Sequence, residues 1–223
     1  MLRAVGVIMD GNRRWAKAKG LPSMAGHKEG FERLKSVARW ARNLGIEQLT
    51  VYAFSTENWN RAKEEVRYLT DELLEHALTT GLEELIEEGG CIRFIGERER
   101  FSQRFQDLMS GMEERTRDNE AGMLIIALSY GGRAEILSAV GRLIIEGASV
   151  SEETLHARMW SAGLQDPDLI IRTGGEERLS NFLTWQSVYS ELHFTKTLWP
   201  DFSEEEFRTI CKSVESRDRR MGK

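Results

Sequence analysis

The sequence predicts a single α/β domain built on a parallel sheet. Short apolar segments alternate with longer amphipathic ones, and several apolar segments run directly into polar, glycine-containing turns. A strand followed by a helix and then another strand is typical of a parallel sheet. The chain has 223 residues, enough to bury a large core, and shows no linker or internal repeat. We therefore assign residues 1–223 to one domain.

Six short apolar segments are the expected strands. An unbroken apolar run is expected of a strand in the interior of a parallel sheet, which is buried on both faces. The segment from Met123 to Leu128 is the clearest example, because all six of its residues are apolar. The expected strands cover residues 5–9, 49–54, 92–95, 123–128, 168–171 and 191–194.

Helical spacing of apolar residues predicts the segments between the strands. The longest expected helix covers residues 62–88, and its apolar stripe fits either simple core packing or the wall of an elongated cavity. A glycine turn at residues 26–30 is expected to open another helix. Further helical segments are expected at 15–19, 31–42, 98–118, 134–146, 151–159 and from 203 onward.

Composition excludes several classes of protein. The formal net charge of −5 disfavours a general nucleic-acid-binding surface. No apolar run approaches the roughly 20 residues that span a bilayer, and no signal peptide is evident, so we expect a cytoplasmic protein. Cys91 and Cys211 have no metal-site spacing and are expected to be reduced thiols.

Polar residues collect after the expected strands. Asp10 follows the first strand and precedes Arg13 and Arg14, which suits a divalent cation and an anion clamp. Arg172 and Arg178 flank a glycine pair after the fifth strand. A solvated turn and surface ion pairs are the alternative readings of these two motifs. Further candidate groups are Arg61, Ser180 and Glu191. The residues alone indicate an enzyme that acts on a phosphorylated substrate with Mg²⁺.

The chain resembles the cis-prenyltransferases, the undecaprenyl diphosphate synthase family, along nearly its whole length. Six sequence blocks carry the resemblance, and they occur in the family's order. They are DGNRRWAK at 10–17 with GH at 26–27, YAFSTENWNR at 52–61, YGGR at 130–133, RTGGE at 172–176, RLSNF at 178–182 and WPDF at 199–202.

The resemblance implies a six-stranded, mostly parallel sheet that is surrounded by helices and encloses a hydrophobic tunnel. It also implies a homodimer that condenses isopentenyl diphosphate with an allylic diphosphate, expected to be farnesyl diphosphate. The product would be a Z-polyprenyl diphosphate, a precursor of an undecaprenyl-type cell-wall lipid carrier. Contact with a membrane would be peripheral at most, for product release.

The resemblance also assigns roles to residues of this chain. Asp10 would be catalytic and hold Mg²⁺, Glu191 would assist the metal, and Asn58 occupies the position of a proposed proton-handling residue. The allylic diphosphate would be bound by Gly11, Asn12, Arg13, Arg14 and His27, and isopentenyl diphosphate by Arg172, Arg178 and Ser180. The remaining substrate-binding candidates are Trp15, Ser23, Leu179 and the covering-loop residues Ser55, Thr56, Glu57, Trp59 and Arg61. A terminal Arg-x-Gly motif at 220–222 would reach the partner subunit.

Three departures from the family pattern stand out. Ser23 occupies a position where many members carry an arginine, while Arg13 replaces a glycine found in some bacterial members and is positioned to compensate. Glu75 and His76 place polar groups in the long helix, where a tunnel wall would be apolar.

Three other functions compete with a long-chain synthase. A short-chain Z-prenyl diphosphate synthase is the first, although the small Ala53 at the expected tunnel entrance favours longer products. A non-catalytic partner subunit is the second, but such a subunit should lack the carboxylate at Asp10. An RNA-binding module is disfavoured because the chain is acidic and shows no basic strand surface with stacking aromatics.

Overall fold

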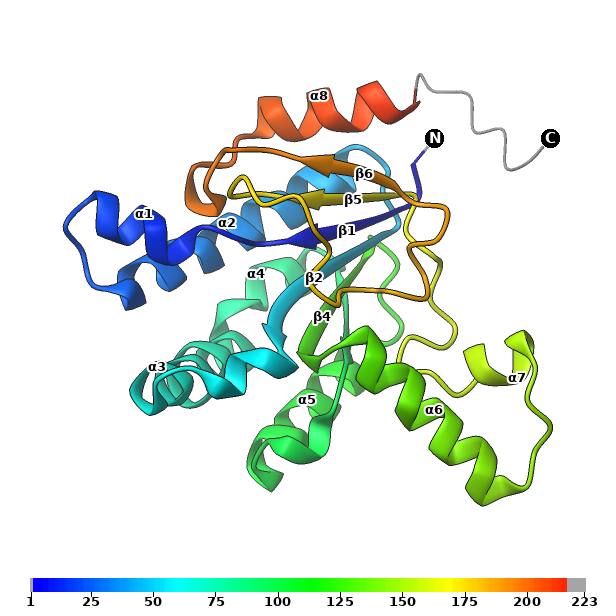
Figure 1. Ribbon diagram of the computed structural model, residues 1–223. Coiled ribbons are helices and arrows are strands. Elements are labelled where there is room, and N and C mark those ends of the chain that lie inside the picture. Colours follow the sequence, from blue (N-terminus) through cyan, green and yellow to red (C-terminus); the bar gives the residue numbers. More distant parts are fainter. Residues whose placement is uncertain (1, 216–223) are drawn as a thin grey trace.

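A single six-stranded parallel sheet forms the centre of the computed structural model, which describes residues 2–215 (Figure 1). The strands are β1 (Ala4–Ile8), β2 (Gln48–Ser55), β3 (Cys91–Ile95), β4 (Met123–Tyr130), β5 (Leu169–Arg172) and β6 (Glu191–Phe194). They lie in the order β3-β4-β2-β1-β5-β6, and every pair of neighbours is parallel. All six predicted strands are confirmed, each within two residues of the expected bounds.

Helices connect these strands and surround the sheet. The α-helices are α1 (Asn12–Ala18), α2 (Ser23–Asn43), α3 (Lys63–Arg67), α4 (Glu83–Glu87), α5 (Gln103–Thr116), α6 (Gly132–Glu146), α7 (Glu152–His156) and α8 (Glu204–Glu215). Short 3₁₀ turns occur at η1 (Thr56–Asn60), η4 (Arg98–Arg100) and η5 (Trp199–Asp201). Serine side chains cap three helices, because Ser102, Ser151 and Ser203 each accept a backbone N–H from the first turn that follows.

The expected glycine turn at residues 26–30 is wrong, because both glycines lie inside α2. A Cβ at Gly26 would lie 2.1 Å from the Asn12 carbonyl oxygen. A Cβ at Gly30 would lie 2.2 Å from Asn12 Oδ1 and 2.9 Å from the Trp199 ring. These glycines allow α1 and η5 to approach α2 closely, so they serve helix packing rather than a turn.

The expected long helix over residues 62–88 is present, but part of it is π-helical and a turn at Leu82 precedes its last segment. Two π-helical segments, η2 (Tyr68–Leu74) and η3 (Ala77–Gly81), separate α3 from α4. π-helical turns inside α-helices occur frequently at functional sites. Here the wider turns lie beside the apolar pocket described below, whose lining includes Leu69, Leu73 and Ala77.

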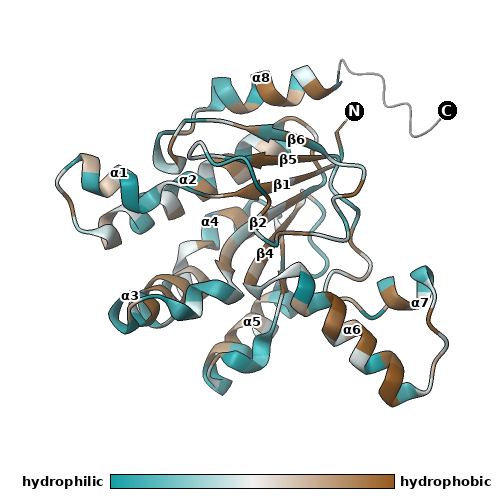
Figure 2. Cartoon of the chain, in the orientation of Figure 1, coloured by the Kyte–Doolittle hydropathy of each residue, from teal (hydrophilic) through white to brown (hydrophobic). Residues whose placement is uncertain are grey.

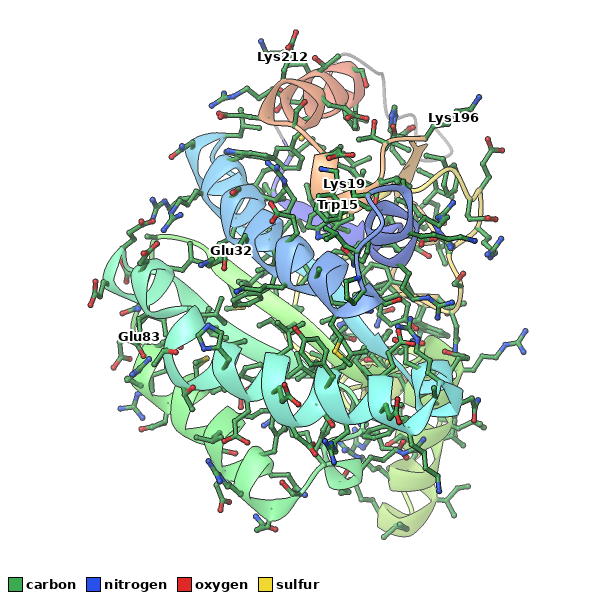
Figure 3. All side chains as sticks on the ribbon, turned by 90° about the vertical axis from the view of Figure 1, so that its left-hand side faces the viewer. Trp15, Lys19, Glu32, Glu83, Lys196 and Lys212 are labelled. Atoms are coloured by element: carbon green, nitrogen blue, oxygen red, sulfur yellow. The ribbon has the colours of Figure 1, made fainter. Side chains whose placement is uncertain are left out.

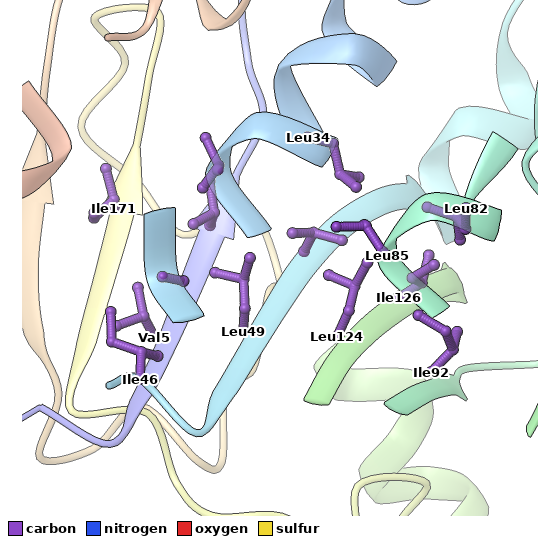
Figure 4. Packing of buried hydrophobic residues seen from close by; sticks show 14 of the residues in the cluster. Val5, Leu34, Ile46, Leu49, Leu82, Leu85, Ile92, Leu124, Ile126 and Ile171 are labelled. Atoms are coloured by element: carbon purple, nitrogen blue, oxygen red, sulfur yellow. The ribbon is translucent and has the colours of Figure 1, made fainter. Parts of the chain in front are cut away.

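The main hydrophobic core lies between the sheet and the helices on one face. Alternate strand residues such as Val5, Leu49 and Ile126 pack there with Leu34 of α2 and Leu82 (Figure 4). The intervening residues face a smaller cluster on the opposite side of the sheet, where Ile170 packs with Phe182 and Leu183. Figure 2 shows the resulting pattern, with apolar strands inside and polar faces on most surrounding helices.

Two further expectations concern the chain as a whole. Cys91 and Cys211 are both free and buried, and burial raises the pKa of each thiol, to about 12 for Cys211. The buried thiols therefore stay protonated at neutral pH. Within residues 2–215, no helix is both long enough and apolar enough to cross a bilayer.

Candidate functional site

The candidate site begins at Asp10, two residues beyond β1. The Thr173 hydroxyl accepts the Asp10 N–H (3.1 Å) and donates to the Asp10 carbonyl oxygen (2.8 Å). The Trp199 N–H donates to the same carbonyl oxygen (3.0 Å). Gly11 follows with φ 114°, a conformation that favours glycine. The backbone therefore holds Asp10 firmly at the carboxyl edge of the sheet.

Two arginines pair with the Asp10 side chain. Arg14 Nη2 lies 3.2 Å from Oδ1, and Arg172 Nη2 lies 3.0 Å from Oδ2. The Arg172 side chain is only 5% exposed, whereas that of Asp10 is 30% exposed. Arg172 also donates to Ser180 Oγ (2.7 Å) and to the Arg178 carbonyl oxygen. We call Asp10, Arg14 and Arg172 the strand-end cluster.

The absence of a side chain at Gly174 leaves room for Arg14 and Asp10 of the strand-end cluster. Gly174 has φ 87°, and a Cβ there would lie 2.6 Å from Arg14 Nη2 and 3.1 Å from the Asp10 backbone. No other residue type fits this position without displacing Arg14 or Asp10. Gly174, the first glycine of the pair between Arg172 and Arg178, therefore packs directly against the strand-end cluster.

The strand-end cluster borders an open polar pocket of about 540 Å³. The carboxyl ends of parallel strands meet at one edge of a sheet, which is where ligands bind in open α/β folds. The pocket brings together residues from β1, β2, β5 and the segments that follow them. Its predicted members are Asp10, Asn12, His27, Ser55, Glu57, Asn58, Arg61, Arg172 and Ser180.

A second charged group lies beside this pocket. Glu65 Oε1 is 2.9 Å from Arg61 Nη1 and 3.2 Å from His27 Nε2, and Glu65 Oε2 is 3.6 Å from Arg13 Nη1. We call Glu65, Arg13, His27 and Arg61 the helix cluster. Burial lowers the pKa of His27, and the positive charges of Arg61 and Arg13 lower it further. His27 is therefore neutral at pH 7, and its Nε2–H donates to the Glu65 carboxylate.

An apolar pocket adjoins the polar one. Met9, Asn12, His27, Ala53 and Leu69 line both pockets. The further lining is apolar and comes from α2, the π-helical segments and the sheet, including Phe31, Leu34, Leu73, Leu74 and Ile126. Its volume is about 70 Å³. The long hydrophobic tunnel remains a prediction.

Two predicted tryptophans serve packing rather than the polar pocket. The Trp15 indole N–H donates to Asp201 Oδ1 (2.7 Å), and Lys19 Nζ lies 4.0 Å from its ring centre (Figure 3). The Trp59 indole N–H donates to Ser129 Oγ (2.9 Å). Neither side chain lines the polar pocket.

Several other predicted residues also have roles within the protein itself. Asn58 Oδ1 accepts the Ser55 N–H (3.1 Å), so its amide caps η1. Arg178 is exposed and pairs with Glu176. Thr56, Leu179 and Ser23 are not among the residues that line the polar pocket, and Ser23 is exposed at the start of α2. The terminal motif at 220–222 lies outside the described residues.

Glu191 does not lie beside Asp10 of the same chain. Glu191 begins β6 and pairs with Leu169, which in turn pairs with Val5 at the opposite end of β1 from Asp10. At about 3.3 Å per residue, the five positions from Val5 to Asp10 correspond to roughly 16 Å along the strands. Glu191 is therefore distant from Asp10 of the same chain, because Glu191 starts its strand whereas the polar pocket gathers groups that follow strands.

Three residues at the site, Glu65, Thr173 and Tyr52, are not among the predicted ones. Thr173 directly follows Arg172, so its place after a strand was the available signal. Tyr52 lines the polar pocket, and its ring stacks on Phe182 with centroids 4.7 Å apart. Glu65 offered only a weak signal, its i,i+4 spacing from Arg61 on a helix.

The donor set at Asp10 fits Mg²⁺ only together with substrate phosphates. Among the residues described, no three His, Cys, Asp or Glu side chains gather into a metal cage. Mg²⁺ is often held by one or two carboxylates plus phosphate oxygens and water, and the partly exposed Asp10 provides one such carboxylate.

The sequence is similar to those of known prenyltransferases. Residues 8–222 match the family model described as "Putative undecaprenyl diphosphate synthase". The chain is 45% identical to an isoprenyl transferase of Chromobacterium violaceum, covering 99% of this chain and 88% of that protein. It is also 45% identical to one of Thermotoga maritima, covering 98% and 95%.

Two solved structures share the fold. One is a lavandulyl diphosphate synthase from Lavandula x intermedia in complex with dimethylallyl diphosphate, with TM-score 0.93, 33% identity and coverage of 100% of this chain and 98% of that one. The other is a probable undecaprenyl diphosphate synthase from Campylobacter jejuni, with TM-score 0.84, 33% identity and coverage of 100% and 99%. The chain belongs to the undecaprenyl diphosphate synthase family of prenyltransferases.

Proposed function

We propose that the protein condenses isopentenyl diphosphate with an allylic diphosphate, with farnesyl diphosphate as the expected primer, to form a Z-polyprenyl diphosphate. The observation that carries the proposal is the buried Arg172, paired with Asp10 in a polar pocket that adjoins an apolar one. Diphosphate groups need cationic partners and prenyl chains need apolar surroundings. The two adjoining pockets provide both.

The residues of this chain would bind and orient the two substrates. Arg172 and Ser180 present a guanidinium and a hydroxyl to isopentenyl diphosphate, and Arg14 faces the primer diphosphate. Charge-assisted contacts of this kind fix geometry as well as charge, so the double bond can be held against the allylic carbon. Apolar side chains such as Leu69 would receive the prenyl chain, at about 0.8 kcal/mol for each buried methylene.

Mg²⁺ is part of this proposal. When bound with the diphosphate at Asp10, it would neutralise negative charge on the leaving group. Arg14 and Arg172 now occupy both carboxylate oxygens of Asp10. We infer that the arginines turn toward the phosphates when substrate arrives, because a diphosphate carries more negative charge than one carboxylate.

Asn58 is better suited to shaping the site than to accepting a proton. Its Oδ1 accepts the Ser55 N–H, and an amide is a poor base. By capping η1, Asn58 fixes the segment that carries Arg61 to the edge of the polar pocket. The proton released from isopentenyl diphosphate would then pass to an oxygen that this segment helps to position.

A short-chain synthase is the second candidate function. The small apolar pocket and the likeness to a lavandulyl diphosphate synthase favour it. Ala53 at the junction of the two pockets favours a longer product. A non-catalytic subunit is disfavoured, because Asp10 and the complete strand-end cluster are present.

A homodimer is also proposed. Helix α6 exposes Leu137, Ile144 and Ile145, which are 72%, 73% and 87% exposed. Figure 2 shows this apolar character along the helix. A second copy that covered these side chains would bury them, and a mass measurement in solution tests this.

The defining experiment incubates the protein with farnesyl diphosphate, labelled isopentenyl diphosphate and Mg²⁺, and then sizes the products. Long Z-products support the polyprenyl synthase, and products with one or a few added units support the short-chain alternative. If labelled isopentenyl diphosphate is not incorporated with farnesyl, geranyl or dimethylallyl diphosphate as primer, the proposed function is wrong.

A further inference from the structure

Glu65 joins three cationic or potentially cationic side chains that come from three different parts of the chain. Arg13 lies in α1, His27 lies in α2, and Arg61 follows η1. Each lies within 3.6 Å of a Glu65 carboxylate oxygen. Glu65 therefore links these three side chains to one another.

The Glu65 carboxylate is ionised although its side chain is largely buried. Its side chain is only 17% exposed, and burial alone would raise its pKa. Arg61, His27 and Arg13 outweigh that effect, so the pKa of Glu65 is lowered and the carboxylate stays ionised. A half-buried carboxylate of this kind is stable only where cations and hydrogen-bond donors surround it.

Arg61 and His27 also line the polar pocket, but Glu65 does not. Glu65 therefore supports these side chains from behind and leaves their pocket sides available. The two arginine side chains in so small a space would repel one another or spread apart without a central negative charge. A carboxylate also repels a diphosphate, so Glu65 is not itself a substrate ligand.

We propose that Glu65 is a positioning residue for the allylic diphosphate: it holds Arg13, His27 and Arg61 together at one side of the polar pocket, where they bind the primer. This inference rests on the proposed function for the identity of the ligand. The arrangement also explains how Arg13 contributes despite an exposed side chain. Glu65 draws its guanidinium toward His27, while Ser23, the position with the missing arginine, stays exposed.

The test compares Glu65→Gln with Glu64→Gln. Glu64 is the adjacent exposed residue of α3, so its variant removes the same charge from the same helix outside the cluster. Inorganic pyrophosphate binding is measured by calorimetry, and KM for farnesyl diphosphate and for isopentenyl diphosphate is measured by steady-state kinetics. Circular dichroism and melting curves confirm that both variants fold.

For Glu65→Gln we expect pyrophosphate binding about tenfold weaker or more, and a matching rise in KM for farnesyl diphosphate. The KM for isopentenyl diphosphate and kcat should change less than about threefold. Glu65→Asp, which keeps the charge on a shorter side chain, should recover part of the affinity. Glu64→Gln should match the wild type in every measurement.

Three results would overturn the proposal. One is pyrophosphate binding by Glu65→Gln that is unchanged or tighter than in the wild type. Another is an equal rise in KM for both substrates. The third is no recovery by a folded Glu65→Asp. Pyrophosphate binding reports on Glu65 even if the protein makes no prenyl product, so failure of this inference and failure of the proposed function can be told apart.

Discussion

The charged side chains of the strand-end cluster and of the helix cluster are held in place in different ways. In the strand-end cluster, Asp10 and Arg172 are tied to the sheet: the Thr173 hydroxyl and the Trp199 backbone N–H bind the Asp10 backbone, and Arg172 is almost fully buried. In the helix cluster, Glu65 binds its three partners through side-chain contacts, and Arg13 is 58% exposed. One cluster is set by the backbone, whereas the other is assembled by side chains.

We therefore expect the two clusters to tolerate substitutions to different degrees. A group anchored to a strand end cannot move to compensate for a lost neighbour, so each substitution should have a large and local effect. Side chains on helices can re-pair, so changes in the helix cluster should be smaller and should affect primer binding more than turnover.

Asp10→Ala should lower kcat by about a thousandfold or more, because several kcal/mol of leaving-group stabilisation depend on this carboxylate. Steady-state assays with farnesyl diphosphate, labelled isopentenyl diphosphate and Mg²⁺ measure the effect. Asp10→Asn keeps the shape and should be equally inactive. Activity of either variant within about tenfold of the wild type would exclude the metal role of Asp10.

Arg172→Ala and Arg14→Ala should separate the two substrates. Each lost charge-assisted contact is worth about 1.5–3 kcal/mol, or roughly tenfold to more than a hundredfold in affinity. Arg172→Ala should weaken isopentenyl diphosphate, and Arg14→Ala should weaken the primer. Separate KM values for each substrate test the assignment, and equal losses for both substrates in both variants would contradict it.

Gly174→Ala should disturb the strand-end cluster from its backbone side. The new methyl group would meet Arg14 Nη2 at 2.6 Å, and the left-handed backbone adds about 1–2 kcal/mol of strain. Gly45→Ala is the matched control, since Gly45 has φ 75° and no atom within 4 Å of an added Cβ. Both variants should lose stability in melting curves, but only Gly174→Ala should lose turnover, by about tenfold or more for one displaced charge-assisted contact. Equal activity of the two variants would show that Gly174 does not shape the site.

The smallest effect concerns His27 and pH. Because burial lowers the pKa of folded His27, the unfolded chain binds its proton more readily, and stability should fall as pH drops below about 6.5. The loss is at most about 1.4 kcal/mol for each unit of pKa difference. His27→Gln should show a flatter dependence between pH 5.5 and 7.5. This range avoids titration of Glu65, whose pKa is lowered from an already acidic value. Parallel curves for the wild type and the variant would contradict the prediction.

Some elements could be read from local patterns, and others could not. The run Met123–Leu128 identifies a buried strand because a strand covered on both faces needs no polar side. Gly26 and Gly30 do not form the predicted turn, because glycine also allows helices to pack closely. The two uses differ in what the glycines contact, and here the contacts are Asn12 and Trp199 from other parts of the chain. The π-helical turns of η2 and η3 also lack a local signal, because they depend on how this helix lies against the rest of the core.

The sequence by itself determined the parallel sheet, the order of its strands along the chain and the polar groups that follow β1, β2 and β5. Those features depend on residues close together in the chain, and strand direction then fixes the edge at which the groups meet. Only the tertiary structure decided that Glu191 lies at the far edge from Asp10, and that Glu65 draws Arg13, His27 and Arg61 together. The physical reason is that the spatial order of the strands and the packing of helices against each other follow from contacts across the whole core, which no short stretch of sequence contains.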